Sequence, residues 1–288
     1  MRTLVIDASP ILYMSVFARD GLALATEDGR RTECAYRLIT TIFSMCELYS
    51  TNKVVVTFDS KINNRKLISP DYKANRQEVP ENIKEKRKEI FEQIPRIKEF
   101  LTTSNIEWYE FEGFESDDLI ASICFNNPGF FTLIVSDHDM YQLLRPNIDM
   151  YFLSKRKQYT VKDFEQEFGI PPTKYHQVLA LAGDPTDNVK GIPGIGERTA
   201  LNFVKKTLSS SSKKYKEILK GKDLYFETMR LVKLPLENCP VIKLEYKVPS
   251  YTGFIEACEN LEFASILKKR TDPFYIDNWK SVLFNEEA

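Results

Sequence analysis

Three aspartates stand at the ends of β-rich apolar runs, where their carboxylates could act together. The runs are TLVID, KVVVTFD and FTLIVSD, and they end at Asp7, Asp59 and Asp137. Continuous apolar runs of this kind are typical of strands buried on both faces, as in a parallel sheet covered by helices. The carboxyl ends of such strands form the ligand site of an α/β sheet. One such aspartate would be an ordinary strand end, but three in register are harder to explain in that way.

Six further acidic residues fall at helix starts or after strands, in the segments GFESDD, SDHD and GDPTDN. Two carboxylates about 4 Å apart repel each other by about 4 kcal/mol at an effective dielectric of 20, so a cluster of nine requires cations. Oxygen ligands without clustered His or Cys favour Mg²⁺ or Mn²⁺ over zinc, and two such ions can promote phosphodiester hydrolysis. The candidate metal ligands are Asp7, Asp59, Glu115, Asp117, Asp118, Asp137, Asp139, Asp184 and Asp187.

The overall charge is consistent with an acidic centre on a basic body. The 288 residues include 40 Lys or Arg and 41 Asp or Glu, which gives a net charge of −1. Without the nine candidate ligands, 32 acidic residues remain against 40 basic ones, so the rest of the molecule carries +8. Such a surface can contact phosphates around a metal-filled centre.

The remaining composition indicates a globular protein inside the cell. Five widely spaced cysteines predict reduced thiols and a cytoplasmic location. No apolar run reaches the roughly 18 residues that a membrane-spanning helix needs.

The elements between the apolar runs predict an α/β fold with a central, mainly parallel sheet flanked by helices. Helical patterns cover residues 33–49 and 116–125. We expect an α/β core at residues 1–170, a second module at 171–222 and a C-terminal segment at 223–288 whose helices and strands pack back on the core. Within the core, residues 61–100 carry a basic excess of four charges. There Pro80 is expected to open a helix that Pro95 kinks or ends.

Taken in order, IDAS, FDS, YKANR, GFESDD, SDHDM and GDPTDNVKGIPGIGERTA resemble the 5′-nuclease family over roughly residues 3–205. That family includes flap endonucleases, phage 5′–3′ exonucleases and the N-terminal nuclease domain of bacterial DNA polymerase I. The resemblance implies a PIN-like fold with a helical arch at residues 61–100 and a helix-hairpin-helix module. It also implies two-metal hydrolysis of DNA near 5′ ends or 5′ flaps, with RNA-primer hybrids as further substrates. We expect a monomeric, stand-alone and phage-encoded enzyme.

The resemblance also implies roles for individual residues. Lys73 and Arg76 correspond to the basic pair that acts on the scissile phosphate, and the loop at residues 191–196 to a hairpin that binds the DNA backbone and a K⁺ ion. The candidate DNA-binding residues are Arg65, Tyr72, Gly191, Gly194, Gly196, Arg198, Lys205 and Lys206.

Two alternative functions stay open. A PIN-type ribonuclease shares the acidic strand ends but needs neither the hairpin nor the basic segment. A catalytically inactive DNA-junction-binding protein would be expected to lack some of the acids, whereas all nine positions are filled. A dehalogenase-type phosphatase is excluded, because Asp7 is followed by Ala8 and Ser9 and not by the second aspartate of a DxD motif.

Overall fold

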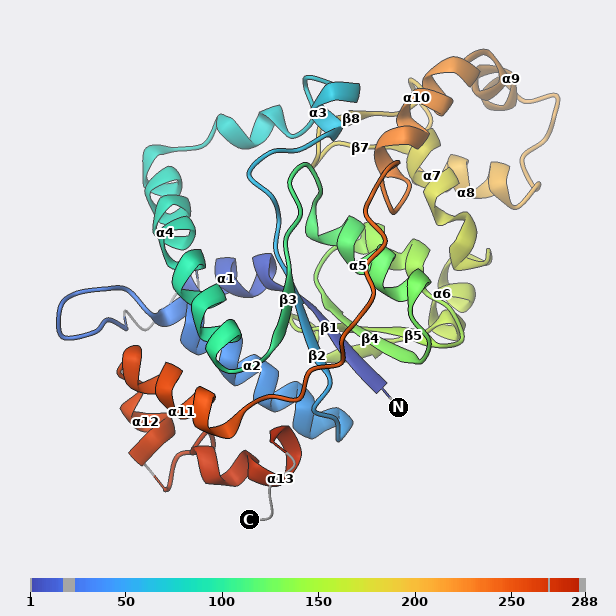
Figure 1. Ribbon diagram of the computed structural model, residues 1–288. Coiled ribbons are helices and arrows are strands. Elements are labelled where there is room, and N and C mark those ends of the chain that lie inside the picture. The colour runs from blue at the N-terminus through green and yellow to red at the C-terminus, as the bar shows by residue number, and fades with distance from the viewer. Residues whose placement is uncertain (1, 18–23, 269, 285–288) are drawn as a thin grey trace.

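A six-stranded sheet with the order β3-β2-β1-β4-β5-β6 forms the centre of the molecule (Figure 1). The computed structural model describes residues 2–17, 24–268 and 270–284. Neighbouring strands are parallel throughout, except that β6 runs antiparallel to β5. This arrangement confirms the expected mainly parallel α/β sheet. The strands are β1 (Arg2–Asp7), β2 (Val54–Thr57), β3 (Glu107–Tyr109), β4 (Phe130–Val135), β5 (Ile148–Phe152) and β6 (Lys157–Tyr159).

Both faces of the sheet are buried, as the continuous apolar runs predicted. Side chains alternate along a strand, so Leu4 and Ile6 face one apolar cluster and Val5 faces the other. The first cluster packs under α1 (Ala8–Phe17), α2 (Glu33–Tyr49), α4 (Glu81–Thr103) and α11 (Tyr251–Asn260). The second packs under α5 (Ser116–Asn126) and α7 (Tyr175–Ala182).

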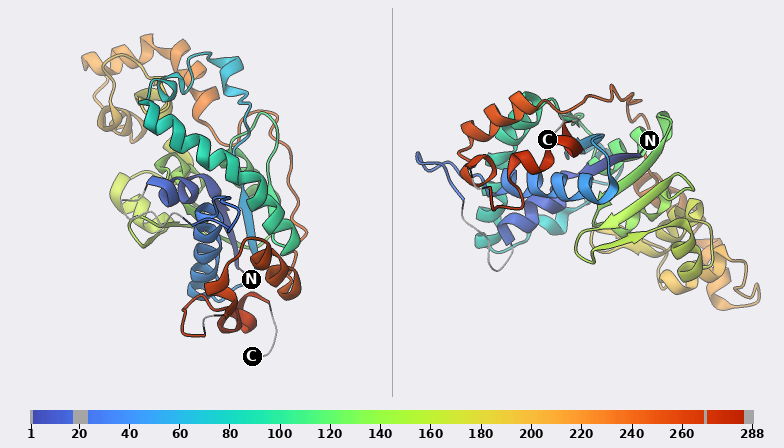
Figure 2. Two further views of the ribbon diagram at one scale, coloured as in Figure 1. Left: turned by 90° about the vertical axis from the view of Figure 1, so that its left-hand side faces the viewer. Right: turned by 90° about the horizontal axis from the view of Figure 1, so that it is seen from below.

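The segment predicted as a helical arch contains α3 (Arg65–Ile68), the 3₁₀ turn η1 (Ala74–Gln77) and the long helix α4. From α3 the chain crosses above the sheet to the top of α4, which then descends beside the core (Figures 1 and 2). Pro80 precedes α4 as expected, but Pro95 lies inside the helix. The helix therefore does not end at Pro95, which was one of the two expected outcomes, but continues to Thr103. Buried Gln93 and Ile97 anchor the helix on both sides of the proline, and this packing outweighs one missing hydrogen bond.

The second module lies beyond β6. After α6 (Val161–Phe168), which still falls in the expected core, its elements are η3 (Pro172–Lys174), α7, the short strands β7 (Gly183–Asp184) and β8 (Val189–Lys190), α8 (Glu197–Val204) and α9 (Lys213–Lys220). The next helix, α10 (Lys222–Val232), begins at the expected boundary and packs against α7 of this module. The division into three parts otherwise stays a prediction.

The C-terminal segment returns to the core. An extended stretch between α10 and α11 lies along β3, where Glu107 accepts hydrogen bonds from the backbone N–H groups of Glu245 and Tyr246. It ends in α11, α12 (Ala264–Lys268), η4 (Ile276–Trp279) and α13 (Lys280–Leu283). The expected strands are not found in the described part of this segment.

Two further observations concern the whole chain. All five cysteines are free, as expected, and four of them are buried. Among residues 2–17, 24–268 and 270–284, no helix has the length and apolar character needed to cross a membrane.

Candidate active site

The ends of β1 and β2 bring Asp7 and Asp59 together at the carboxyl edge of the sheet. Asp7 accepts a hydrogen bond from the backbone N–H of Ser9 at 3.2 Å. Ser9 in turn donates its hydroxyl to Asp59 at 2.6 Å, and Asp59 also accepts the backbone N–H of Ser116 at 2.9 Å. Asp59 thus lies at the N-terminus of α5, where the helix dipole favours a negative charge. Burial, followed by repulsion from Asp59, raises the pKa of Asp7 to about 8.

A pocket beside these residues collects most of the other candidate ligands. Its polar lining residues are Arg65, Tyr72, Glu115, Asp117, Asp137, Asp139, Asp184 and Asp187. Burial and repulsion between carboxylates raise the pKa of Asp139 to about 8 and also raise the pKa values of Asp117 and Asp137. Burial and mutual repulsion thus favour the protonated form of these carboxyl groups when no cation is bound.

The acidic loop (residues 184–188) reaches the pocket because the chain turns sharply between α7 and β8. Gly183 has a φ of 74°, and a Cβ atom there would lie 2.3 Å from the backbone nitrogen of Gly191. Only glycine permits this close approach. Within the loop, Asp184 accepts hydrogen bonds from the backbone N–H and the hydroxyl of Thr186 at 2.8 and 2.7 Å.

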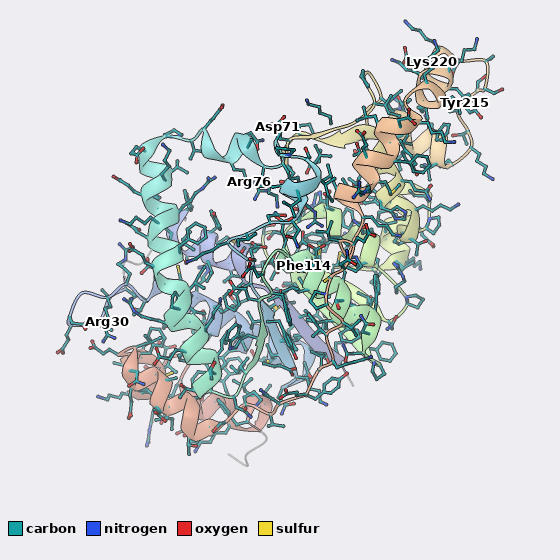
Figure 3. The ribbon with its side chains drawn as sticks, turned by 45° about the horizontal axis from the view of Figure 1, so that its top comes forward. Arg30, Asp71, Arg76, Phe114, Tyr215 and Lys220 are labelled. Atoms are coloured by element: carbon teal, nitrogen blue, oxygen red, sulfur yellow. The ribbon has the colours of Figure 1, made fainter. Side chains whose placement is uncertain are left out.

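The basic segment (residues 71–76) lies on this loop, and its cations pair with carboxylates that line the pocket. Lys73 pairs with Glu115 and, at 3.3 Å, with Asp187, and Arg76 also pairs with Asp187. Burial of Glu115 opposes its ionisation, but Lys73 and Arg65 outweigh burial and lower its pKa. Figure 3 shows Arg76 and Asp71 over the edge of the core, away from Tyr215 and Lys220 at the far tip of the second module.

Arg65, which lines the pocket, forms a buried ion pair with Asp118. The guanidinium donates two hydrogen bonds to Asp118, at 2.6 and 2.8 Å, and a third to the carbonyl of Leu231 at 2.8 Å. Arg65 is 2% exposed and Asp118 is fully buried. Asp118 also accepts the backbone N–H of Leu236 at 2.7 Å. These contacts differ from the sequence expectation in two ways. Asp118 was expected to bind a metal ion, but its oxygens accept hydrogen bonds from Arg65 and Leu236. Arg65 was expected to bind DNA, but its side chain is buried.

Tyr72 is likewise buried, with 4% of its surface exposed. Its hydroxyl donates to Glu115 at 2.8 Å and to Asp187 at 3.0 Å. It therefore holds two candidate ligands in place and, in this structure, does not offer its ring to DNA.

The chemistry of the pocket suits hard divalent cations. The potential metal ligands are carboxylate oxygens, and burial, followed by repulsion between the carboxylates, raises the pKa values of Asp117 and Asp139. Within the described residues, however, no group of three or more His, Cys, Asp or Glu side chains is already arranged as a metal site. The pocket is acidic and crowded, but its carboxylates do not point at one common position for a cation. Two of them, Glu115 and Asp187, are paired with Lys73 and Arg76.

The hairpin loop follows β8 and leads into α8. Gly194 has a φ of 75°. The close approach made by Gly191 is to the backbone of Ala182 within the protein, whereas Gly196 faces open space at the start of α8. Arg198, Lys205 and Lys206 are exposed on and after the same helix. The structure thus brings the expected cations to one end of the second module, separate from the pocket.

Some contributors to the site were not found from the sequence. Ser9 and Ser116 donate hydrogen bonds that orient Asp59. Each lies one or two residues from a predicted metal ligand, and this proximity was the only feature of the sequence that could have indicated their role. Asn75 and Asn188 join the basic segment to the acidic loop. Both lie inside motifs that were recognised, but no local pattern indicates their partners.

Comparisons with known proteins agree with this geometry. The family model described as "5′-3′ exonuclease, N-terminal resolvase-like domain" matches residues 2–169. The 5′-3′ exonuclease of Aquifex aeolicus is 32% identical over 284 residues, covering 93% of this chain and 95% of the relative. DNA polymerase I of Caldicellulosiruptor bescii is 31% identical over 293 residues, covering 93% of this chain but 33% of the relative. The chain therefore spans about a third of that polymerase.

Solved structures share the fold at lower identity. T5 5′-exonuclease, in a structure with bound zinc, matches with a TM-score of 0.70 and 20% identity, over 98% of this chain and 100% of that chain. Flap endonuclease-1 from Methanococcus jannaschii matches with a TM-score of 0.58 and 17% identity, over 99% of this chain and 93% of that chain. The resemblance predicted from the motifs is confirmed: the chain belongs to the 5′-3′ exonuclease family.

Proposed function

We propose that this chain hydrolyses phosphodiester bonds of DNA near 5′ ends and 5′ flaps, as a 5′–3′ exonuclease and flap endonuclease. The observation that carries the proposal is the gathering of strand-end and loop carboxylates around one pocket, four of them with raised pKa values. Such a pocket is a site for divalent cations next to a polyanionic substrate.

We assign the holding of two Mg²⁺ or Mn²⁺ ions to Asp7, Asp59, Asp117, Asp137, Asp139, Asp184, Asp187 and Glu115. When bound, such ions activate a water and stabilise the leaving oxygen. Asp118 enters the proposal differently from the sequence expectation, as a residue that anchors Arg65 beside the ligands.

Lys73 and Arg76 are the residues proposed to contact the scissile phosphate. Their ammonium and guanidinium groups already pair with Glu115 and Asp187, two carboxylates that line the pocket. A phosphate entering there would offer them an alternative anionic partner, and charge that develops on its oxygens would be stabilised by both cations.

The hairpin at residues 191–196, with Arg198, Lys205 and Lys206, is proposed to hold the duplex away from the cut. Backbone N–H groups at the start of α8 suit a phosphate, and a K⁺ ion at the hairpin belongs to the same proposal. The proposal further includes RNA-primer hybrids as substrates, a monomeric protein, and a location inside the cell, where DNA is present. Phage origin stays a prediction from the motif resemblance.

The test is cleavage of 5′-labelled flap, nicked and blunt duplexes in Mg²⁺. The wild type should cut near the 5′ end or the flap junction. Asp137→Ala should lower the single-turnover rate by at least about 10²-fold while leaving flap binding largely intact, because phosphate contacts come from other residues. Glu165→Ala, which removes an exposed carboxylate on α6, is the matched control and should leave the rate unchanged.

The same substrates separate the alternatives. Near-wild-type turnover by Asp137→Ala would remove it from the metal site. A preference for single-stranded RNA over every DNA substrate would favour the PIN-type ribonuclease. Tight flap binding without cleavage in Mg²⁺ or Mn²⁺ would favour the inactive junction-binding protein.

A further inference from the structure

The basic segment and the acidic loop are joined by hydrogen bonds between uncharged groups, in addition to their ion pairs. Asn75 lies in η1, next to Arg76 in the basic segment. Its side-chain amide donates to the carbonyls of Pro185 and Thr186, each at 3.2 Å. Both acceptors belong to the acidic loop, one and two residues after the candidate ligand Asp184.

A second amide makes the reciprocal connection. Asn188, at the end of the acidic loop, donates its side-chain amide to the carbonyl of Asp71 at 2.7 Å. Between these two amides, the backbone N–H of Lys73 donates to the carbonyl of Asp187 at 2.9 Å. The two segments are more than 100 positions apart in the chain, yet each supplies an asparagine that binds the backbone of the other.

These neutral contacts differ in one important respect from the ion pairs beside them. Lys73 and Arg76 bind the carboxylates of Glu115 and Asp187, which are also candidate ligands for divalent cations. Cations that take these carboxylates would compete with Lys73 and Arg76 for them. The amide–carbonyl bonds involve no carboxylate, so cation binding leaves their partners unchanged.

We propose that Asn75 and Asn188 are positioning residues that hold the basic segment on the acidic loop while Lys73 and Arg76 exchange carboxylate partners for substrate phosphate. This inference rests on the proposed function, because it assumes that the two cations serve phosphodiester cleavage. Asn75 and Asn188 themselves touch neither substrate nor metal. They act by keeping Lys73 and Arg76 at the mouth of the pocket, where a displacement of about 1 Å can cost about 10²-fold in rate.

The backbone conformation of Asn188 limits which substitution can test this role. Its φ is 56°, in the left-handed region that asparagine tolerates better than most residues. Asn188→Gly removes the amide while retaining this conformation, whereas alanine would add backbone strain. Asn75→Ala removes the other amide within a short helical turn. The matched control is Asn147→Ala, because Asn147 donates to the carbonyl of Gly129 at 2.9 Å, next to the amino end of β5 and away from the pocket.

The first measurement needs neither metal nor activity. Trypsin cuts after Lys73 and Arg76, and a segment released from the loop is a better substrate than a docked one. In EDTA, Asn75→Ala and Asn188→Gly should each speed cleavage at these two bonds by about tenfold. Cleavage after the exposed Lys205 serves as an internal reference and should not change, and Asn147→Ala should behave as the wild type.

The second measurement is a double-mutant cycle on a 5′ flap in Mg²⁺. Each asparagine variant should slow the single-turnover rate by about 10- to 100-fold, with the dissociation constant for DNA within about twofold of wild type. In a Lys73→Ala background, Asn75→Ala should add less than about twofold, because the residue through which it acts is already absent. A residue that only supported the fold would lower the rate additively and would weaken DNA binding or stability as well.

The results that overturn the inference are equally specific. Unchanged trypsin cleavage after Lys73 and Arg76 in both asparagine variants would show that the amides do not hold the segment. Fully additive rate losses in the Lys73→Ala background would show that Asn75 does not act through Lys73. If the wild type cleaves no DNA, the proposed function fails by itself, and the trypsin measurement still decides whether the amides hold the segment.

Discussion

Arg65→Met should destabilise the protein without acting on DNA directly. Arg65 donates three hydrogen bonds, two to Asp118 and one to the carbonyl of Leu231, and both members of the ion pair are almost completely buried. Methionine fills a similar volume but leaves the Asp118 carboxylate buried without its cation. The variant therefore tests whether Arg65 is a structural anchor or the DNA contact that the sequence suggested.

The structure allows the size of the effect to be worked out. Breaking a buried ion pair by removing one partner costs about 3–5 kcal/mol. A chain of 288 residues, at about 2.1 cal/mol/K for each residue, has an unfolding entropy of about 0.6 kcal/mol/K at the melting temperature. The expected loss is therefore about 5–8 °C in melting temperature.

The assay is thermal unfolding in EDTA, followed by circular dichroism, with a double variant as the decisive comparison. Asp118→Asn in the Arg65→Met background removes the unpaired charge but keeps an oxygen for the backbone N–H of Leu236, so it should recover part of the loss. A melting temperature of Arg65→Met within about 1 °C of wild type, together with weaker DNA binding and a flatter salt dependence, would refute the anchor and favour a DNA contact.

Two further predictions concern the pocket and the hairpin. Asp7 and Asp139 have pKa values raised to about 8, so they keep their protons in the folded protein but release them above about pH 4 in the unfolded chain. The melting temperature in EDTA should therefore fall from about pH 5 to about pH 8, and a rise over this range would contradict the raised pKa values of these two carboxyl groups. Gly194→Val places a side chain at a φ of 75°, with its Cβ 2.9 Å from Lys214, and should raise the dissociation constant for duplex DNA by about tenfold. Gly29→Val, at a φ of 84° in open space, is the matched control, and equal effects of both variants on binding would argue against a specific role of the hairpin.

The sheet and its main helices could be predicted from the sequence because their signals are local. Apolar runs that end at Asp7, Asp59 and Asp137 indicated strands covered on both faces, and parallel strands place their carboxyl ends at one edge. The concentration of acids at those ends indicated a cation site by chemistry alone. The family followed from the order of the motifs, and the comparisons confirm it.

Pro95 shows where a local signal was misleading. A proline inside a helical pattern removes one hydrogen bond and predicts a kink or an end. In the structure, apolar contacts of α4 with α2 and α11 extend on both sides of the proline, and the helix continues to Thr103. Packing against distant segments thus outweighed the preference to end the helix at Pro95, and no window of sequence around Pro95 contains that information.

The partners of the charged residues were decided only by the tertiary structure. Asp117 and Asp118 are adjacent and chemically identical, but helix geometry turns Asp117 toward the pocket and Asp118 toward Arg65, which lies 53 positions earlier in the chain. Whether a carboxylate meets a cation, a guanidinium or water depends on distances between segments that are remote in sequence. A sequence reveals which residues can ionise and the regular spacing of local elements, whereas electrostatic pairing depends on burial and distance, which exist only after the chain has folded.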